Sequence, residues 1–557
     1  MSITPPVTEL NIKLANRGFY KGFNQVVTLG SKILIVVLAI WAAVFPDQAG
    51  GLLKTMQGWS FESFGAWYIY AMAFYVFVCF FLAINPATGK IILGDENQKP
   101  EFSTFSWISM MFGAGIGIGM LTFSTAEPLY HFASNPDTIS GVVAAQSDET
   151  LRSVYKWSFF HWGLSAWGCY AIVGLALSFF TYNRNLPLTI RSGLTPLFGK
   201  KLEGMLGDVV DISAVIATIL GVAVTIGFGI SQFAAGMYTI SGADWMINAE
   251  GSPTNTAMII ALVVVMAASI LSAASGVGKG IKWLSNINMV LSFALLLFFL
   301  VFGSSMVALK SLFVGILDYV INFPIQAMTY WANSDVEPAA TLYKWQSIWW
   351  TVFYWAWWIA FAPFVGLFFA RISKGRSIRE YVMGTMLIPS LMCFIWFAFV
   401  GGSAIDLELH GTAAGTILNA GQEAQLFATL KVMLSSGAAK AMSVMVVVLL
   451  MTYLVTSADS AVLIINTINS GGDEKQKDKT HVIFWGAAVT VLIAALLIAG
   501  GLTAIKSAML VGALPFSFIM VLMGIALIKA LVRDGMRARE EDSGKAVSEK
   551  NLEATKS

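Results

Sequence analysis

The stretch "WWTVFYWAWWIAFAPFVG" (349–366) places five tryptophans within ten residues of an otherwise apolar segment. On a helix, Tyr354, Trp357, Trp358 and Phe361 fall within an arc of roughly 100°. Electron-rich ring faces attract quaternary ammonium and sulfonium groups, which have no N–H to offer to a carboxylate. The pattern therefore predicts an aromatic cage for an onium group. Core packing of the same rings is the alternative.

A second aromatic set shares one broad face of an earlier apolar segment: Trp162, Trp167 and Tyr170. Membrane proteins also place Trp and Tyr in belts at the two lipid–water interfaces. Trp349 and Trp350 fit such a belt, because they stand at the end of their segment. Trp162, Trp357 and Trp358 stand near the middle of theirs, where the belt does not explain them and the cage does.

Two further motifs could provide oxygen ligands for a cation. The segment "TYLVTSADS" (452–460) holds the adjacent hydroxyls of Thr456 and Ser457. Ordinary bonding of these hydroxyls to the preceding helical turn is one interpretation. The other is a Na⁺ site, because hard cations prefer oxygen ligands. Such a site also needs backbone carbonyls from residues near Gly113, Ile116 and Tyr453.

The glycine run "GAGIGIG" (113–119) is where those carbonyls could become free. Each interior glycine costs about 1 kcal/mol of helix propensity relative to alanine, so four of them favour local unwinding. Contacts between small residues of neighbouring helices, with Gly113 and Gly117 on one face, are an alternative that is compatible with unwinding. Pro363 and Gly366 predict a second interrupted helix, because proline removes a backbone hydrogen bond.

These motifs lie in a chain built for the bilayer. Of 557 residues, 57% are hydrophobic and 12% are charged, and the mean hydropathy is +0.72. Soluble domains carry about 25% charged residues, so a soluble protein is excluded. Apolar runs of about 20 residues predict about twelve transmembrane helices in an all-α protein. Lys and Arg collect in alternate loops, which predicts that both termini are cytoplasmic.

The predicted organisation is a single membrane domain. Residues 1–28 form an N-terminal tail, 29–532 the transmembrane domain and 533–557 a disordered or weakly helical C-terminal tail. Interrupted helices in two halves point to inverted repeats, over about 103–304 and 345–532, with two extra helices before them. Amphipathic stretches within 305–344 and 403–437 predict helices that lie along the membrane surface.

Three acidic residues and a histidine stand inside or beside apolar runs: Glu127, Asp211, Asp459 and His161. Charged groups there are costly and usually functional. None is predicted to be a ligand. For Glu127, gating, hydrogen bonding at a helix end and substrate contact stay open as alternatives, and His161 is assigned a structural role. No phosphate-binding G-x-x-x-x-G-K-[ST] motif and no H-E-x-x-H zinc motif is present, which argues against an ATP-driven motor and a metalloenzyme.

Taken together, four segments resemble the betaine/choline/carnitine transporter family. They are "AGIGIG", "HWGLSAWGCYAIVGLA", "FYWAWWIAFAPFVGLFFARISKGRSIRE" and "VTSADS", with "LGDENQKPEF" as a fifth match. The resemblance implies a ten-helix inverted-repeat core, a midplane aromatic box and frequently a homotrimer. The box residues carried over are Trp162, Trp167, Tyr170, Trp357, Trp358 and Phe361, with Trp355 alongside. The Na⁺ ligands that it implies are Gly113, Ile116, Tyr453, Thr456 and Ser457.

The chain departs from the family pattern at two positions that bear on specificity. Ile116 replaces the usual Met of the glycine motif, and Phe361 replaces a Trp of the box. Choline-type members tend to carry Asp where this chain has Gly119, which favours a zwitterion over choline. A second sodium site of the family would use Thr218 and the neighbourhood of Phe364. Its other hydroxyl position is Val222 here, which argues against that site.

The sequence therefore predicts a secondary active transporter of the cytoplasmic membrane, with no enzymatic activity and no nucleic-acid partner. It would import an osmolyte such as glycine betaine or a sulfonium analogue, with Na⁺ as the coupling ion and no other cofactor. A sodium-independent exchanger on the same fold is the first alternative. Such exchangers carry a basic residue in the fifth span, and residues 208–238 contain none. A non-transporting membrane sensor of the same ligand is the second.

Overall fold

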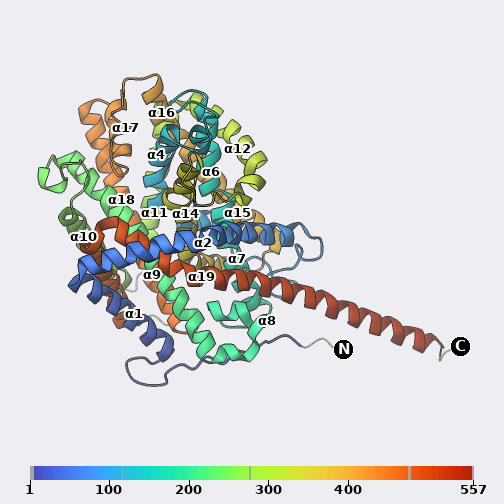
Figure 1. Cartoon of the computed structure of the whole chain (residues 1–557). Coiled ribbons are helices and arrows are strands. Elements are labelled where there is room, and N and C mark those ends of the chain that lie inside the picture. Colours follow the sequence, from blue (N-terminus) through green and yellow to red (C-terminus); the bar gives the residue numbers. More distant parts are fainter. Residues whose placement is uncertain (1–4, 116, 275–277, 474–477, 555–557) are drawn as a thin grey trace.

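A computed structural model of the chain describes residues 5–115, 117–274, 278–473 and 478–554, and over these residues it consists of helices joined by loops (Figure 1). Helices satisfy every backbone hydrogen bond within one segment, as a lipid environment requires. The longer helices are α1 (Gln25–Val44), α2 (Pro46–Ile84), α9 (Met205–Ser241), α10 (Asn255–Ala274), α11 (Gly278–Phe302), α12 (Ser305–Met328), α14 (Thr351–Ile372), α15 (Ile378–Trp396), α18 (Ser436–Asn469) and α19 (Lys479–Ala554).

Shorter elements connect or prolong them. The short α-helices are α3 (Thr104–Gly115), α4 (Ile118–Ala133), α5 (Pro136–Ile139), α6 (Thr150–Trp162), α7 (Leu164–Tyr182), α8 (Thr195–Phe198), α13 (Ala339–Tyr343), α16 (Gly402–Leu409) and α17 (Gln425–Met433). The 3-10 turns are η1 (Ile190–Leu194), η2 (Gly199–Glu203) and η3 (Asp244–Met246), and the π-helical turns are η4 (Lys344–Trp349) and η5 (Phe397–Gly401).

Eleven helical segments of the described residues are long and apolar enough to cross a membrane. The prediction of an all-α membrane protein is confirmed. The count includes α12, which the sequence analysis assigned to the membrane surface. It omits α3 and α4, which are 12 and 16 residues long. It also treats α19 as one segment, although the non-helical backbone angles of Gly500 and Gly501 divide it.

The predicted unwinding of the glycine run is confirmed at Gly117, whose backbone angles (φ −161°, ψ −130°) are not helical and which directly precedes the start of α4 at Ile118. The predicted interruption at Pro363 and Gly366 is wrong. Helix α14 continues through both, and the break lies before it, at Trp350 (φ −129°, ψ −82°). Gly366 serves close packing instead, because a Cβ there would meet Val173 Cγ1 of α7 at 2.6 Å.

A second break divides the helical segment that carries Trp162. Helix α6 ends at Trp162 and α7 begins at Leu164, with Gly163 between them at φ −97° and ψ −136°. A Cβ on Gly163 would meet the Tyr319 hydroxyl of α12 at 2.7 Å. The Tyr319 hydroxyl accepts a hydrogen bond from the Leu164 N–H at 2.8 Å, which satisfies a donor that the break leaves without a helical partner.

The helices that carry the aromatic motifs lie inside the bundle. In their most apolar stretches, 94% of the α6–α7 segment and 89% of the segment ending in α14 are buried, against 22% for α11 and 28% for α12. Helix α14 packs on α7 and α9, and α18 packs on α9 and α11. Lipid-facing surface therefore falls to α11 and α12, while α7 and α14 are free to build an internal site.

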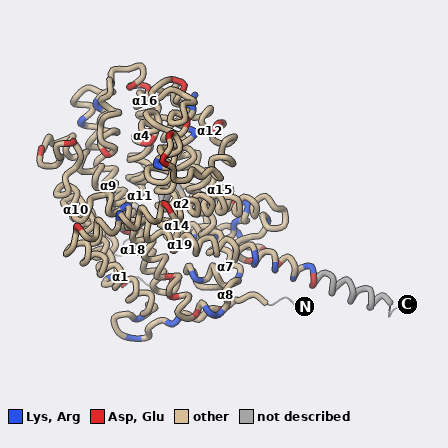
Figure 2. The backbone as a smooth tube through the Cα atoms, in the orientation of Figure 1, with Lys and Arg blue, Asp and Glu red and all other residues tan. Residues whose placement is uncertain are grey.

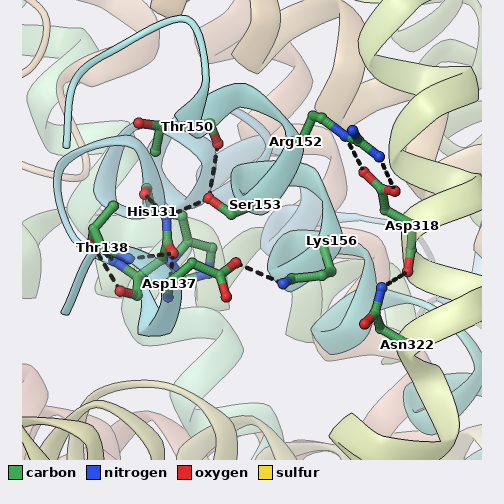
Figure 3. Close-up of polar contacts among 10 residues, drawn as sticks. His131, Asp137, Thr138, Thr150, Arg152, Ser153, Lys156, Asp318 and Asn322 are labelled. Carbon is green, nitrogen blue, oxygen red and sulfur yellow. Dashed lines mark hydrogen bonds and ion pairs between the residues drawn. The ribbon is translucent and has the colours of Figure 1, made fainter. Parts of the chain in front are cut away.

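Polar contacts tie α12 to α6 (Figure 3). The Arg152 guanidinium donates to both carboxylate oxygens of Asp318, at 2.6 and 2.8 Å. Lys156, one turn further along α6, forms an ion pair with Asp137 at 2.6 Å. These contacts fix the first turns of α6, the helix that ends at Trp162.

Both chain ends lie on the same side of the molecule, and the last part of α19 projects from it as a helix (Figure 1). The end that the sequence predicted to be disordered or weakly helical is thus helical to Ala554. Lys and Arg gather around α8, the N-terminal segment and this part of α19 (Figure 2). This side is called the terminus side below. Its assignment to the cytoplasm remains a prediction from the charge pattern.

Candidate functional site

Aromatic rings from α4, from the α6–α7 break and from α14 gather in the middle of the bundle. The predicted cage residues that share this cluster are Trp162, Trp167, Tyr170, Trp357 and Trp358, all buried. Tyr354, one turn before Trp358, and Phe123 of α4 join them, at 5.7 and 6.0 Å from the Trp162 ring respectively. The structure thus brings together aromatics that lie almost 200 residues apart in the sequence.

Several of these rings meet at nearly right angles. Trp162 lies across Trp358 at 5.0 Å and 77° and across Trp357 at 6.5 Å and 87°. Tyr170 meets Trp358 at 6.1 Å and 81°. Trp357 and Trp358 stack at 5.0 Å and 10°. Edge-to-face and stacked rings at such separations pack directly against one another, so the use of their faces as a cage for an onium group stays a prediction.

The indole N–H groups of the cluster are all occupied by protein acceptors. Trp162 donates to Glu127 Oε2 at 2.6 Å, and Trp358 donates to the His161 carbonyl at 3.1 Å. Trp167 donates to the Trp162 carbonyl at 3.0 Å, and Trp357 to Thr225 Oγ1 at 3.1 Å. Ring faces, and not hydrogen-bond donors, are therefore what these tryptophans can offer to a ligand.

Glu127 is the polar centre behind the cluster, a role that the sequence analysis missed. Its Oε2 accepts from the Trp162 indole and from the Tyr354 hydroxyl, both at 2.6 Å. Its Oε1 is hydrogen-bonded to His161 Nδ1 at 2.6 Å and to His131 Nε2 at 3.1 Å. One fully buried carboxylate thus holds two aromatic side chains of the cluster and two histidines. These three acidic and imidazole groups are also close enough together to hold a metal ion.

Gly119, on the helical turn after the glycine break, faces the cluster directly. A Cβ at this position would meet Trp357 Cη2 at 3.0 Å and Trp162 Cη2 at 3.1 Å. Both rings are held by hydrogen bonds to Thr225 and Glu127, so neither is free to retreat. The glycine is what lets α4 approach both walls of the cluster.

Two predicted cage residues lie apart from the cluster. Trp355 is buried on another side of α14, at 5.2 Å from Phe160 and 5.8 Å from the His161 ring. Phe361 is half-buried, pairs with Phe364 at 5.1 Å, and lines a cavity next to the cluster. Trp355 lies about one turn before Trp358 on α14, where its ring packs against Phe160 and His161, and Phe361 lies about one turn after Trp358.

That cavity, of about 390 Å³, lies between α14, α18, α11 and α3 and is called the terminus-side cavity. Arg371, near the end of α14, lines this cavity. The backbone carbonyl of Arg371 accepts a hydrogen bond from the Tyr182 hydroxyl of α7. Just beyond Tyr182, Arg184 pairs with Asp534 of α19. The cavity also collects residues of the predicted sodium site: Tyr453, Thr456 and Ser457.

The hydroxyl of Thr456 already has partners within the protein. It donates to the Thr452 carbonyl at 3.0 Å or the Tyr453 carbonyl at 3.2 Å, and it accepts from Asn288 Nδ2 at 3.1 Å. Bonding to the preceding turn, the alternative interpretation of this motif, is therefore present. Ile116 lies outside the described residues, and of Gly113 only its place in α3 is described.

Asn288 of α11 carries an amide oxygen that could serve as a cation ligand and that the sequence analysis did not identify. Its side chain is 6% exposed and lines the terminus-side cavity, and its Oδ1 has no hydrogen-bond partner among the described residues. A buried acceptor without a partner is costly. Together with Ser457, this carbonyl oxygen is suited to a hard cation.

The other intramembrane acids have structural partners. Asp211 and Asp208 both pair with the buried Arg191, at 2.6 and 2.7 Å. Asp459 accepts from the Ser272 hydroxyl at 2.6 Å. These groups fasten helices to each other away from the aromatic cluster, as expected for charges that are not ligands.

Comparison with known proteins assigns the class. Residues 26–536 match the betaine/carnitine/choline transporter (BCCT) family. The chain belongs to this family. It is therefore a multi-pass membrane transporter and not an enzyme, and the resemblance inferred from the motifs is confirmed.

Curated BCCT relatives align with nearly the whole chain. It is 38% identical to a glycine betaine transporter of Acinetobacter baylyi, over 90% of this chain and 73% of that protein. It is 35% identical to the glycine betaine transporter OpuD of Bacillus subtilis, over 90% and 95%. It is 36% identical to a high-affinity choline transport protein of Escherichia coli, over 91% and 72%.

Gly119→Ala tests whether the cluster is the transport site of this BCCT protein. The added methyl would crowd two restrained tryptophans, and overpacking of this kind costs about 1–3 kcal/mol. We expect the KM for glycine betaine uptake to rise about tenfold. Gly58→Ala is the control, because nothing lies within 4 Å of a Cβ there. An unchanged KM in Gly119→Ala would separate the cluster from the substrate path.

Proposed function

We propose that this BCCT transporter imports a small onium zwitterion, glycine betaine or a sulfonium analogue, by Na⁺ symport. The observation that carries the proposal is the set of perpendicular ring faces of Trp162, Trp357, Trp358 and Tyr170. A desolvated onium group gains up to about 2 kcal/mol from each well-placed ring face. A catalytic role is not needed, because the cluster offers faces and no reactive group.

A zwitterion is favoured over choline because, among the described residues, the cluster offers a lone positive charge no carboxylate oxygen that is without a hydrogen-bond partner. Glu127, the nearest acid, has both oxygens engaged by Trp162, Tyr354 and the histidines. Gly119 adds no anion where choline-type relatives tend to carry Asp. A substrate that brings its own carboxylate meets this environment at lower cost. Two of the relatives are named glycine betaine transporters, which agrees with this choice. The relative named as a choline transport protein makes choline the competing substrate.

Na⁺ is the proposed coupling ion because oxygen atoms that can act as cation ligands lie beside the break between α3 and α4. Ser457 and Asn288 Oδ1 line the terminus-side cavity next to Thr456. Tyr453, whose carbonyl is a predicted ligand, lies 3.5 Å from where a Cβ of Gly117 would be. Residues 208–238 carry no Lys or Arg to substitute for an ion. The sodium-independent exchanger is disfavoured on that ground.

The proposed mechanism is alternating access around the cluster. One end of α14 leads to the terminus-side cavity through Phe361 and Phe364, and the other starts at a second cavity lined by Trp350 and Phe353. Trp357 and Trp358 stand between the two. Ion binding would fix α3 against α18, and rocking of helix groups would open one cavity at a time. Each ligand must then raise the affinity of the other by the same factor.

Uptake of glycine betaine into proteoliposomes, with and without an inward Na⁺ gradient, tests the proposal. We expect accumulation only with the gradient. Equal flux without Na⁺ would support the exchanger, and binding without flux would support the sensor. The predicted homotrimer is tested separately, by the mass of the purified protein in detergent.

Thr456→Ala combined with Ser457→Ala tests the ion site. Removing two of about five oxygen ligands weakens Na⁺ binding, so the Na⁺ concentration for half-maximal uptake should rise about tenfold or more. Thr467→Ala is the control, because Thr467 lies on the same helix with the same bond to the turn before it. An unchanged Na⁺ dependence in the double variant would remove the ion from these residues.

A further inference from the structure

Lys506 is a half-buried lysine that neither the sequence analysis nor the proposed function uses. It lies on α19, five residues after Gly501, whose positive φ of 64° helps divide that helix. Its ammonium lies over two aromatic rings, 5.0 Å from the centre of Phe228 and 5.2 Å from that of Phe353. A Lys held within a helical bundle is rare and marks an ion or substrate path.

The side chain also lines the second cavity at the start of α14, called the far-side cavity. This cavity has a volume of about 380 Å³. Its aromatic walls include Phe123, Tyr130, Trp345, Trp349, Trp350 and Phe353, with Gln422 as a polar member. Trp350, which the sequence analysis placed in an interfacial belt, stacks here on Tyr354 at 6.2 Å and 22°. The aromatic lining of the cavity is thus in contact, through Tyr354, with the aromatic side chains of the cluster.

Only one layer of rings separates Lys506 from the cluster. Phe228 and Phe353, which lie under the ammonium, contact Trp357 at 5.4 and 5.9 Å. Phe123, which lines the far-side cavity, also contacts Trp357 at 5.9 Å. A substrate that passes from this cavity to the cluster therefore passes the ammonium at short range.

The aromatic rings around Lys506 would attract any onium group, so ring faces alone do not distinguish betaine from choline. A fixed positive charge does. Two like charges about 10 Å apart, in an environment with an effective dielectric constant of about 20, repel each other. This repulsion lowers the affinity for a cationic substrate by about tenfold. A carboxylate on the same substrate offsets this repulsion, and makes the net interaction attractive where the carboxylate is the charge nearer to the ammonium. Glu423 is the acid that interacts electrostatically with Lys506, and its Oε1 has no hydrogen-bond partner among the described residues.

We propose that Lys506 is a charge filter on the far-side path to the cluster. It draws in onium compounds that carry a carboxylate and disfavours onium cations that lack one. The inference rests on the proposed function, since it assumes that onium compounds are the substrates. Lys506 and Gly119 contribute separately to this selectivity. Gly119 leaves the cluster without the Asp that choline-type relatives tend to carry, and Lys506 adds a positive charge on the path that leads to the cluster.

The test compares choline and glycine betaine on the full-length protein in proteoliposomes. Inhibition of betaine uptake by choline is measured for the native protein, Lys506→Met and Lys506→Arg. We expect Lys506→Met to lower the choline concentration for half-inhibition about tenfold and to raise the KM for betaine. Lys506→Arg keeps the charge and should match the native protein. Lys440→Met, an exposed lysine of α18, is the control.

A second measurement covers a variant that folds but no longer transports. Binding of betaine and of choline is followed by tryptophan fluorescence in detergent, and the ratio of the two affinities is compared. An unchanged ratio in Lys506→Met would overturn the filter while leaving the proposed function intact. So would a native protein that binds choline as tightly as betaine. A native protein that binds neither would overturn the proposed function and the filter with it.

Discussion

Replacing Trp358 by Leu is expected to abolish glycine betaine uptake while the protein remains folded in the membrane. Trp358 stacks on Trp357 and Tyr354 and stands across Trp162 and Tyr170. Loss of one well-placed ring face removes up to about 2 kcal/mol, or about 30-fold in affinity. Leu fills much of the volume, so α14 should persist. The uptake assay, with thermal unfolding in detergent, measures both.

Two further variants separate loss of the ring face from loss of a tryptophan as such. Trp358→Phe keeps a smaller face and should retain part of the uptake, with a raised KM. Trp59→Leu changes an exposed tryptophan of α2, 54% exposed, and should leave uptake unchanged. Normal uptake in Trp358→Leu would refute the cage, and a large fall in melting temperature would assign Trp358 to core packing.

The sequence was sufficient to predict the class of fold because the bilayer imposes its own pattern. Apolar runs of about 20 residues mark the helices, and the glycine run correctly located the break between α3 and α4. Both signals are local, since each depends on residues that are neighbours in the chain. Family resemblance rested on motifs of the same local kind and was confirmed over residues 26–536.

The wrong prediction at Pro363 shows where local signals fail. Proline removes one backbone donor, but helices in this chain continue through Pro128, Pro324 and Pro389 as well. The actual break before α14 lies at Trp350, where no Gly or Pro stands in the sequence. Tertiary contacts, such as the stacking of Trp350 on Tyr354, accompany that break and cannot be calculated from periodicity.

The aromatic residues of the proposed site were selected by side-chain type alone, as with the paired tryptophans, and their role stays a prediction. The contacts of Glu127 and the position of Lys506 beside the aromatic rings were missed, because both depend on partners from distant helices. A usable signal was present, since a charge in an apolar segment is a functional candidate by default. His131 stands four residues after Glu127, a spacing that brings two side chains together on a helix. Neither signal reveals that Trp162 and Tyr354 complete the set.

Glu127→Ala is expected to remove transport and to destabilise the protein, because one substitution leaves four buried groups without an acceptor. The Trp162 indole and the Tyr354 hydroxyl lose the carboxylate oxygen Oε2 as their acceptor, and His131 and His161 lose Oε1 as their hydrogen-bond partner. A buried donor left unpaired costs about 1–3 kcal/mol. We expect a loss of stability of about 3 kcal/mol or more, together with loss of betaine uptake.

Glu127→Gln distinguishes orientation of the cluster from simple stability. The amide oxygen of Gln can still accept from Trp162 and Tyr354, while its NH₂ group faces the histidines. His161 can respond by accepting at Nδ1 and donating from Nε2 to Thr351, which lies 3.0 Å away. Uptake should therefore survive in part in Glu127→Gln and be lost in Glu127→Ala. Equal uptake in the two variants would show that Glu127 does not orient the tryptophan and tyrosine rings, because only the glutamine retains an acceptor for them.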